Sequence, residues 1–208
     1  MKKLLYFLLL IIFLLDLFFV WNGENEPRFF TKTLLLPLLV IIYVVESKRL
    51  SSSPLQINKL FLTGLILSFF GDLFLLFDWG FLPGLGSFLM AHVLYIITFF
   101  KFKKKNPSVL ITAGISVYLF GLLFFLFPHL NEMKIPVIIY GTVISAMLWF
   151  GVRTRSKLLI LGALLFVISD TLLAFNIFVN QNAILSLLVM ITYVFAQYML
   201  VKGMLKKT

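Results

Sequence analysis

Two aspartates, Asp72 and Asp170, lie within long apolar stretches of the sequence. A charged side chain at the centre of a membrane helix costs roughly 2.5–3.5 kcal/mol on insertion scales, so such residues usually serve a function. Two carboxyl groups in an apolar cavity suit acid–base hydrolysis, because one can stay protonated as the acid while the other, ionised, activates water. We therefore predict that Asp72 and Asp170 are the catalytic residues.

Small and polar residues recur at helical spacing around these aspartates. Gly64, Ser68 and Asp72 are four residues apart and share one helix face, and Gly162 and Asp170 repeat that spacing. The remaining polar residues that flank an aspartate or share a face with one another are Ser169, His92 with Tyr95, and Tyr193 with Gln197. Lipid would solvate none of them, so we predict that they line one interior cavity. The alternative is that they only form hydrogen bonds between helices.

An internal repeat relates the two aspartates. A shift of 98 residues aligns 59–77 with 157–175, with seven of nineteen positions identical, and it places Asp72 opposite Asp170 and Tyr95 opposite Tyr193. An offset that spans four helices keeps the orientation, so we predict a parallel 4+4 internal repeat with halves of about 1–104 and 105–208. Such repeats often place a site where their halves meet, near the middle of the membrane.

The composition excludes a water-soluble globule, because 62% of the 208 residues are hydrophobic and only 12% are charged. The chain has no cysteine, which excludes disulfides, thiolate zinc sites and iron–sulfur clusters. Its two histidines are too few for a zinc site of three or more histidines. We therefore predict no metal site and no cofactor.

Eight apolar stretches approach the length of about 17–25 residues that a membrane helix needs. They cover 4–21, 32–45, 57–77, 82–100, 108–127, 135–151, 158–178 and 183–201. The first resembles a signal-peptide core, but Asp16 interrupts its end and no small-residue cleavage site follows before Trp21, so we predict a retained helix. The sequence thus predicts an all-α membrane protein with eight transmembrane helices in a single polytopic domain, 1–208.

The eighteen basic residues give this arrangement an orientation. Those on one side of the eight spans are Lys2, Lys3, Lys48, Arg49, Lys59, Lys101, Lys103, Lys104, Lys105, Arg153, Arg155, Lys157, Lys202, Lys206 and Lys207. Only Arg28, Lys32 and Lys134 fall on the other side. Lys32 could bind a lipid phosphate there, or it could simply be a residue at the membrane interface. Because Lys and Arg mark cytoplasmic loops, both termini are predicted to be cytoplasmic. The net charge of +10 then needs no nucleic-acid partner, and we expect a multi-pass protein of the bacterial inner (plasma) membrane.

Four segments resemble a known family at this point. They are SFFGDLFLLF (68–77), SFLMAHVLYI (87–96), GALLFVISDTLLAF (162–175) and YVFAQYML (193–200), and they are similar to the YhhN-like family of membrane lysoplasmalogenases. The resemblance implies hydrolysis of the vinyl-ether bond of lysoplasmalogens, with ethanolamine or choline head groups, to a fatty aldehyde and a glycerophospho head group. The substrate would be a lysophospholipid.

On this hypothesis Asp72 and Asp170 divide the acid and base roles, in an order that the sequence leaves open. The residues predicted to bind substrate or position water are Lys32, Ser68, His92, Tyr95, Ser169, Tyr193 and Gln197. Two other classes of function compete with it. Intramembrane carboxylates in a parallel repeat also suit a proton-coupled lipid or small-molecule transporter or flippase. A structural or lipid-binding protein would use the polar residues only to hold helices together.

Overall fold

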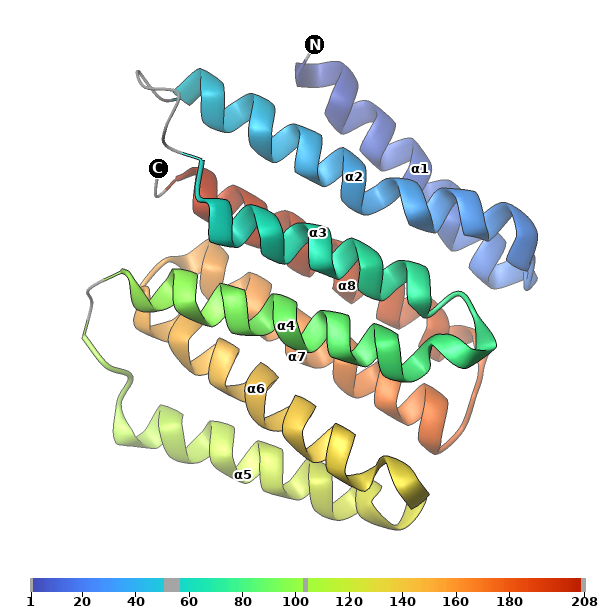
Figure 1. The fold of residues 1–208 in the computed structure, drawn as a ribbon, viewed down its shortest axis with the longest axis vertical. Helices are drawn as coiled ribbons and strands as arrows, with labels where there is room; N and C mark the ends of the chain where they lie inside the picture. The colour runs from blue at the N-terminus through green and yellow to red at the C-terminus, as the bar shows by residue number, and fades with distance from the viewer. Residues whose placement is uncertain (1, 51–56, 103–104, 207–208) are drawn as a thin grey trace.

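Each of the eight apolar stretches forms a helix in the computed structural model, which describes residues 2–50, 57–102 and 105–206 (Figure 1). The long helices of these ranges are α1 (Lys2–Asn22), α2 (Asn25–Leu50), α3 (Lys59–Phe74), α4 (Phe81–Phe100), α5 (Val109–Leu126), α6 (Lys134–Arg153), α7 (Lys157–Phe178) and α8 (Ala183–Leu205). Three short 3-10 turns complete the described structure: η1 (Asp78–Gly80), η2 (Phe127–His129) and η3 (Asn131–Met133). The prediction of an all-α fold is confirmed.

Seven of the described helices have at least 18 residues and are apolar enough to cross a membrane, and α3 is the exception with 16. At 1.5 Å per residue α3 is about 24 Å long, less than the hydrocarbon core of roughly 30 Å. It ends at Phe74 rather than near residue 77, because the chain turns there. A side chain at Gly80 would collide with the carbonyl oxygen of Phe74, so the glycine permits this turn. By the length and composition of its helices, the chain is an integral multi-pass membrane protein.

The second helix is longer than the sequence suggested. We expected residues 32–45, whereas α2 begins at Asn25 and ends at Leu50. Residues 25–31 contain only two apolar side chains, Phe29 and Phe30, besides Pro27, and so gave no apolar run. Pro27 nevertheless suits a first turn, where its missing N–H needs no partner, and Glu26 favours the positive end of the helix dipole. As a result Arg28 and Lys32, four residues apart, lie on one face of a regular helix.

Consecutive helices pack as antiparallel neighbours, except that α4 and α5 are not packed against each other (Figure 1). The most extensive contacts join α3 to α4 and α7 to α8. In addition α2 contacts α3 and α8, while α6 contacts α7 and α4. The helix α5 is peripheral and packs mainly on α6. These pairs are consistent with a parallel 4+4 repeat, but the contact of α1 with α8 has no counterpart between α5 and α4, and the repeat stays a prediction.

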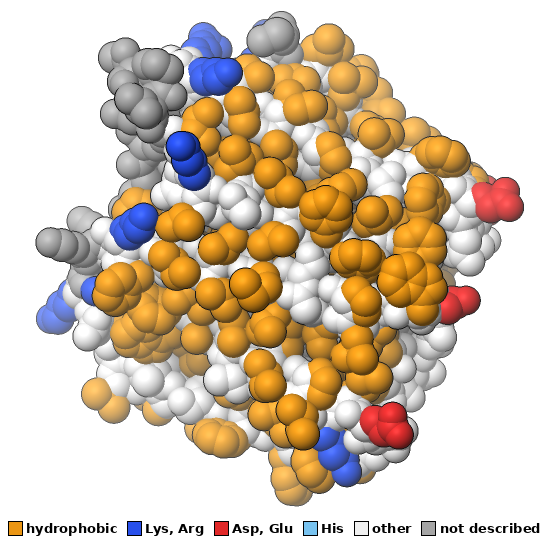
Figure 2. Space-filling model, in the orientation of Figure 1, with side chains coloured by type: hydrophobic (Ala, Val, Ile, Leu, Met, Phe, Trp, Pro, Cys, Tyr) orange, Lys and Arg blue, Asp and Glu red, His pale blue; other side chains and the backbone are white. Residues whose placement is uncertain are grey.

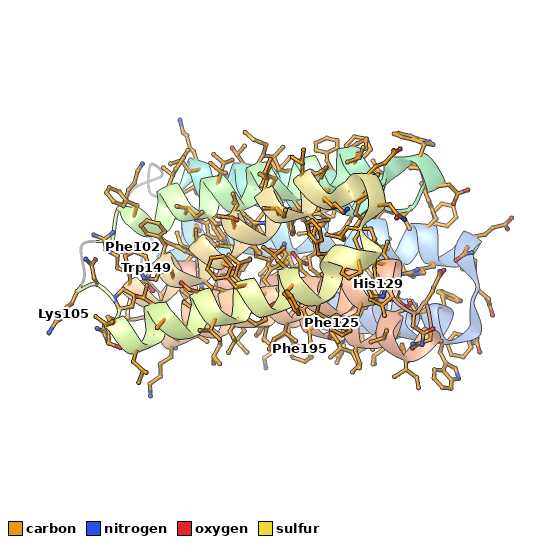
Figure 3. The ribbon with its side chains drawn as sticks, turned by 90° about the horizontal axis from the view of Figure 1, so that it is seen from below. Phe102, Lys105, Phe125, His129, Trp149 and Phe195 are labelled. Carbon is orange, nitrogen blue, oxygen red and sulfur yellow. The ribbon has the colours of Figure 1, made fainter. Side chains whose placement is uncertain are left out.

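Both termini lie at the same end of the bundle (Figure 1). On the face that Figure 2 shows, most Lys and Arg side chains lie at that end and the Asp and Glu side chains lie at the other, where one basic side chain accompanies them. Apolar side chains cover the surface between the two ends. Seen from below, Lys105 and His129 mark the two ends (Figure 3). Of the basic residues that predict the orientation, Lys103, Lys104 and Lys207 lie outside the described residues. The assignment of the basic end to the cytoplasm stays a prediction.

Close approach of α3 to α4 depends on a glycine. A Cβ at Gly64 would lie 2.5 Å from Cε1 of Tyr95, well inside contact distance. Gly162, its equivalent in the predicted repeat, packs against Leu200 of α8, where a Cβ would lie 2.8 Å from the side chain. Each aspartate therefore follows a glycine that brings its helix against the next long helix of the chain, α4 or α8.

Candidate active site

A polar cavity of about 200 Å³ lies between α2, α3, α7 and α8, at the end of the bundle opposite the termini. Its lining residues are Arg28, Lys32, Asp72, Leu75, Phe88, Ser169, Asp170, Leu173, Asn176, Ile177, Gln181, Ser186, Val189, Met190 and Tyr193. The cavity holds both predicted catalytic aspartates, one from α3 and one from α7. Packing has thus brought together two carboxyl groups that are 98 residues apart in the sequence.

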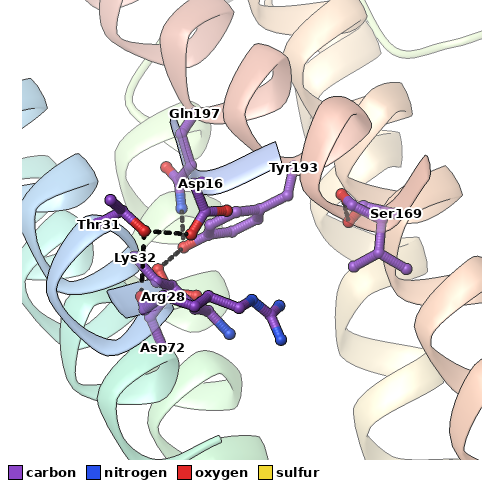
Figure 4. A network of polar contacts seen from close by, with 9 residues as sticks. Asp16, Arg28, Thr31, Lys32, Asp72, Ser169, Tyr193 and Gln197 are labelled. Atoms are coloured by element: carbon purple, nitrogen blue, oxygen red, sulfur yellow. Dashed lines mark hydrogen bonds and ion pairs between the residues drawn. The ribbon is translucent and has the colours of Figure 1, made fainter. Parts of the chain in front are cut away.

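Asp72 has two partners inside the bundle (Figure 4). Its Oδ2 accepts a hydrogen bond of 2.7 Å from the hydroxyl of Tyr193, and its Oδ1 lies 3.9 Å from Nζ of Lys32. The side chains of Asp72 and Lys32 are only 5% and 9% exposed. A carboxylate here is compensated by an ammonium group and a hydroxyl donor, which is what a buried charge requires.

Asp170 has a different environment. Its Oδ2 accepts a hydrogen bond from the hydroxyl of Tyr140 on α6, and no ion pair within the described ranges includes it. The residue also borders a smaller cavity of about 50 Å³, whose walls are almost wholly apolar. That cavity is lined by Leu75, Phe81, Leu85, Phe88, Val137, Tyr140, Asp170, Leu173, Ala174, Ile177 and Phe178. Asp170 therefore stands between a polar and an apolar compartment.

A buried chain of hydrogen bonds leads away from Asp72 toward the basic end of the bundle. Nε2 of Gln197 donates to the hydroxyl of Tyr193 at 3.4 Å, and the hydroxyl of Tyr95 donates to Oε1 of Gln197 at 3.4 Å. The hydroxyls of Tyr95 and Ser68 are 3.3 Å apart. Four residues that were predicted to bind substrate are thus linked to Asp72, and three of them, Ser68, Tyr95 and Gln197, lie behind the cavity wall rather than in it.

The other predicted polar residues have separate places. Ser169 lines the cavity, but its hydroxyl donates to the carbonyl of Val189 at 3.1 Å and so joins α7 to α8. His92 is completely buried and does not line the cavity; neither ring nitrogen has a hydrogen-bond partner among the described residues. Its ring packs edge-on against Phe166 at 4.6 Å and Tyr140 at 5.5 Å between centroids. The structure therefore places His92 beside the tyrosine that holds Asp170.

Sequence reasoning missed three residues of the site. Arg28 lines the cavity one helical turn before Lys32, and an earlier start for α2 would have revealed their common face. Thr31 donates to Oδ1 of Asp16 at 2.9 Å and ties α1 to α2 next to this face. Tyr140 carries no signal in the sequence, because its contact with Asp170 depends on how α6 packs against α7.

Several known proteins are similar to this chain in sequence. The model of the YhhN family matches residues 27–204. Human lysoplasmalogenase TMEM86B is 30% identical over 191 residues, which cover 91% of this chain and 81% of the relative. The lysoplasmalogenase TMEM86B of Rattus norvegicus is 31% identical over 198 residues, covering 91% and 79%. The lysoplasmalogenase of Mycobacterium tuberculosis (strain CDC 1551 / Oshkosh) is 30% identical over 150 residues, covering 67% and 58%. No solved structure matches the chain.

Proposed function

The chain belongs to the YhhN family, and from this premise we propose that it is a membrane-embedded hydrolase that cleaves the vinyl-ether bond of lysoplasmalogens. One observation supports this proposal above the others: Asp72 and Asp170 line the same cavity in a chain whose relatives are named lysoplasmalogenases. The substrate is a lysophospholipid with an ethanolamine or choline head group, and the protein acts on it within the bilayer.

The reaction consumes one water and needs no oxidant or reductant. A proton adds to the β-carbon of the enol ether, and the electron pair of the double bond forms the new C–H bond. The resulting oxocarbenium ion is captured by water, which loses a proton to a base. The hemiacetal then collapses to a fatty aldehyde and releases the glycerol oxygen as a hydroxyl, giving glycerophosphoethanolamine or glycerophosphocholine. An acid and a base on either side of the reacting bond are sufficient.

The environments of the two carboxyl groups suggest their roles. Asp170 has no cationic partner among the described residues and borders the apolar cavity, so we assign it the protonated form that donates to carbon. Asp72 has the ammonium of Lys32 and the hydroxyl of Tyr193 beside it, so we assign it the carboxylate. The carboxylate would stabilise the oxocarbenium ion and take the proton of the attacking water. Two carboxyl groups with environments that separate their protonation states are the usual basis of such a division.

The remaining residues support these two. The hydroxyl of Tyr193 orients Asp72, and Gln197 and Tyr95 hold that hydroxyl in place. The apolar cavity between α4, α6 and α7 would receive the first carbons of the lipid tail, because Phe81, Leu85 and Phe178 offer no polar group to it. No residue in this scheme needs a cofactor.

Topology also belongs to the proposal. We take α1–α4 and α5–α8 as the two halves of a parallel repeat, so that the cavity lies between them with one aspartate from each. The excess of basic residues places both termini in the cytoplasm, and the cavity then opens toward the outer leaflet of a bacterial plasma membrane. Pairing of α2 with α8 and of α6 with α4 is consistent with this arrangement.

The direct test is aldehyde release from a defined lysoplasmalogen by the purified protein. We expect Asp72→Asn and Asp170→Asn each to lower kcat at least about 100-fold, because general acid–base catalysis contributes roughly 10²–10⁴-fold. Asp78→Asn is a matched control, since Asp78 is exposed on η1 outside the cavity. Wild-type rates in both cavity variants would contradict the mechanism. Transfer of labelled lipid across vesicles without cleavage would instead favour a transporter.

A further inference from the structure

Two cations on one face of α2 line the polar cavity: the half-buried Arg28 at its mouth and the buried Lys32 deeper inside. Arg28 and Lys32 are one helical turn apart, and both line the cavity. Arg28 lies three residues after the start of α2, about 4.5 Å along its axis, near the end of the candidate membrane span. Lipid phosphates lie at that depth, because they form the boundary between the hydrocarbon core and water.

The two cations differ in what they already contact. Lys32 is almost wholly buried and pairs with Asp72. Arg28 is half-buried, has no ion pair within the described part of the chain, and its Nε has no hydrogen-bond partner there. In Figure 4 the guanidinium of Arg28 extends away from the Asp72–Lys32 pair and toward the side of Ser169. It is the cation of this cavity that remains available to an external anion.

Across the mouth from Arg28, α7 and α8 present uncharged polar groups. Asn176 donates to Ser186 at 3.1 Å and accepts from the backbone N–H of Asn182 at 2.9 Å, which orders the connection between the two helices. Gln181 on this connection is exposed and lines the cavity as well. The carboxylates that act on Arg28 are Asp72, in the lining, and the buried Asp16 of α1, outside it. Across the mouth, an anion bound to the guanidinium would meet the neutral hydrogen-bonding groups of α7 and α8.

We propose that Arg28 binds the phosphate of the substrate's head group and so fixes how far the lysolipid enters the cavity. This inference rests on the proposed function and deepens it. The planar fork of a guanidinium matches two oxygens of a phosphate, which makes Arg well suited to a diester of this kind. The glycerol unit then spans from the phosphate at Arg28 to the vinyl ether between Asp72 and Asp170. The tail continues into the apolar cavity beside Asp170.

Binding of two uncleavable ligands tests the assignment without any turnover. One is a 1-O-alkyl lysophosphatidylethanolamine, whose saturated ether cannot be hydrolysed by this route; the other is the 1-O-alkylglycerol of the same chain length, which lacks the phosphate. We expect wild-type protein in detergent to bind the phosphorylated ligand about tenfold more tightly, as one charge-assisted contact allows. Arg28→Gln should bring this ratio close to one, and Arg28→Lys should retain part of it, because the charge stays and the fork is lost.

Lys134→Gln is the matched control, because Lys134 is a basic residue of the same end that does not line the cavity and lies over the ring of Phe127. Its ratio should equal that of the wild type. A wild-type ratio in Arg28→Gln, or equal binding of the two ligands by the wild type, would overturn the proposal. Binding of the alkylglycerol by each variant shows that the variant is folded.

Two further measurements distinguish a lipid phosphate from free phosphate, and the phosphate site from the proposed hydrolysis. Inorganic phosphate at millimolar concentration should displace the phosphorylated ligand poorly, and displacement at the affinity of the lipid would reassign Arg28 to a free anion. If the ligand ratio depends on Arg28 but no aldehyde is released, the phosphate site stands and the proposed chemistry falls. If aldehyde is released but the ratio does not depend on Arg28, the chemistry stands and the phosphate site falls.

Discussion

Individual side chains divide the cavity into a charged side and an apolar side. Asp72 shares its side with Lys32 and Tyr193, whereas Asp170 shares its side with Tyr140 and aromatic or aliphatic walls. Two aspartates in equivalent positions of the predicted repeat have thus acquired different partners. This asymmetry is what acid–base chemistry needs, because two identical environments would not favour one protonated and one ionised carboxyl group.

The Lys32–Asp72 contact predicts a particular pattern of stability. Lys32→Met should lower the free energy of unfolding by about 3–5 kcal/mol, because it leaves a buried carboxylate without its cation. Asp72→Asn added to Lys32→Met should recover a large part of that loss, since the amide carries no charge. The measurement is chemical or thermal unfolding of the detergent-solubilised variants.

Lys134, a cation outside the cavity, is the control for the Lys32 and Asp72 variants. Lys134→Met should change stability by no more than about 0.5 kcal/mol, as substitutions at peripheral positions usually do. If the double variant is as unstable as Lys32→Met plus Asp72→Asn taken separately, the two side chains do not interact and the ion pair plays no part in stability.

At the scale of helices, the site depends on two departures from regular membrane spans. The helix α3 is short, so the buried Asp72 lies within one turn of its end. The helix α2 extends farther than its apolar run and carries Arg28 and Lys32 over the same end. Together they form the polar mouth of the cavity. Two continuous apolar helices would have closed the cavity at this end of the bundle.

Close contact between α3 and α4 gives a prediction at this scale. Gly64→Ala should destabilise the protein by about 1–3 kcal/mol, because its Cβ would force the ring of Tyr95 out of place in a packed interior. The shift would also disturb the hydrogen bond from Tyr95 to Gln197, so kcat should fall.

Gly86→Ala is the matched control for Gly64→Ala. Gly86 also lies within a helix, but a Cβ there meets no atom within 4 Å. The variant should be neutral or gain up to about 1 kcal/mol from helix propensity. Equal behaviour of the two variants in unfolding and activity assays would refute a special role for the contact of Gly64 with Tyr95.

For the whole molecule, the arrangement of charge makes a prediction about orientation. On the face that Figure 2 shows, most basic side chains lie at the end with both termini, and the acidic ones lie at the opposite end. The sequence has no cysteine, so single cysteines can be introduced without removing any. Lys105 and His129 are exposed at opposite ends (Figure 3). His129→Cys should react with a membrane-impermeant maleimide in intact cells, and Lys105→Cys should react only after lysis. The reverse pattern would invert the proposed topology.

The sequence by itself determined the helices, because a segment in a bilayer must satisfy its own backbone hydrogen bonds and an apolar run of sufficient length therefore becomes a helix. Helical spacing also placed Gly64, Ser68 and Asp72 on one face before any packing was known. The short polar start of α2 escaped this reasoning, since polarity alone does not separate a loop from a helix end.

Only the tertiary structure decided which residues meet across helices. The hydrogen bonds from Tyr193 to Asp72 and from Tyr140 to Asp170 join residues 121 and 30 positions apart. Periodicity shows which side chains share a face, but the neighbour that a face meets depends on the packing of all the helices at once. For that reason the sequence did not show that His92 lies behind the cavity wall or that Arg28 lies at the cavity mouth.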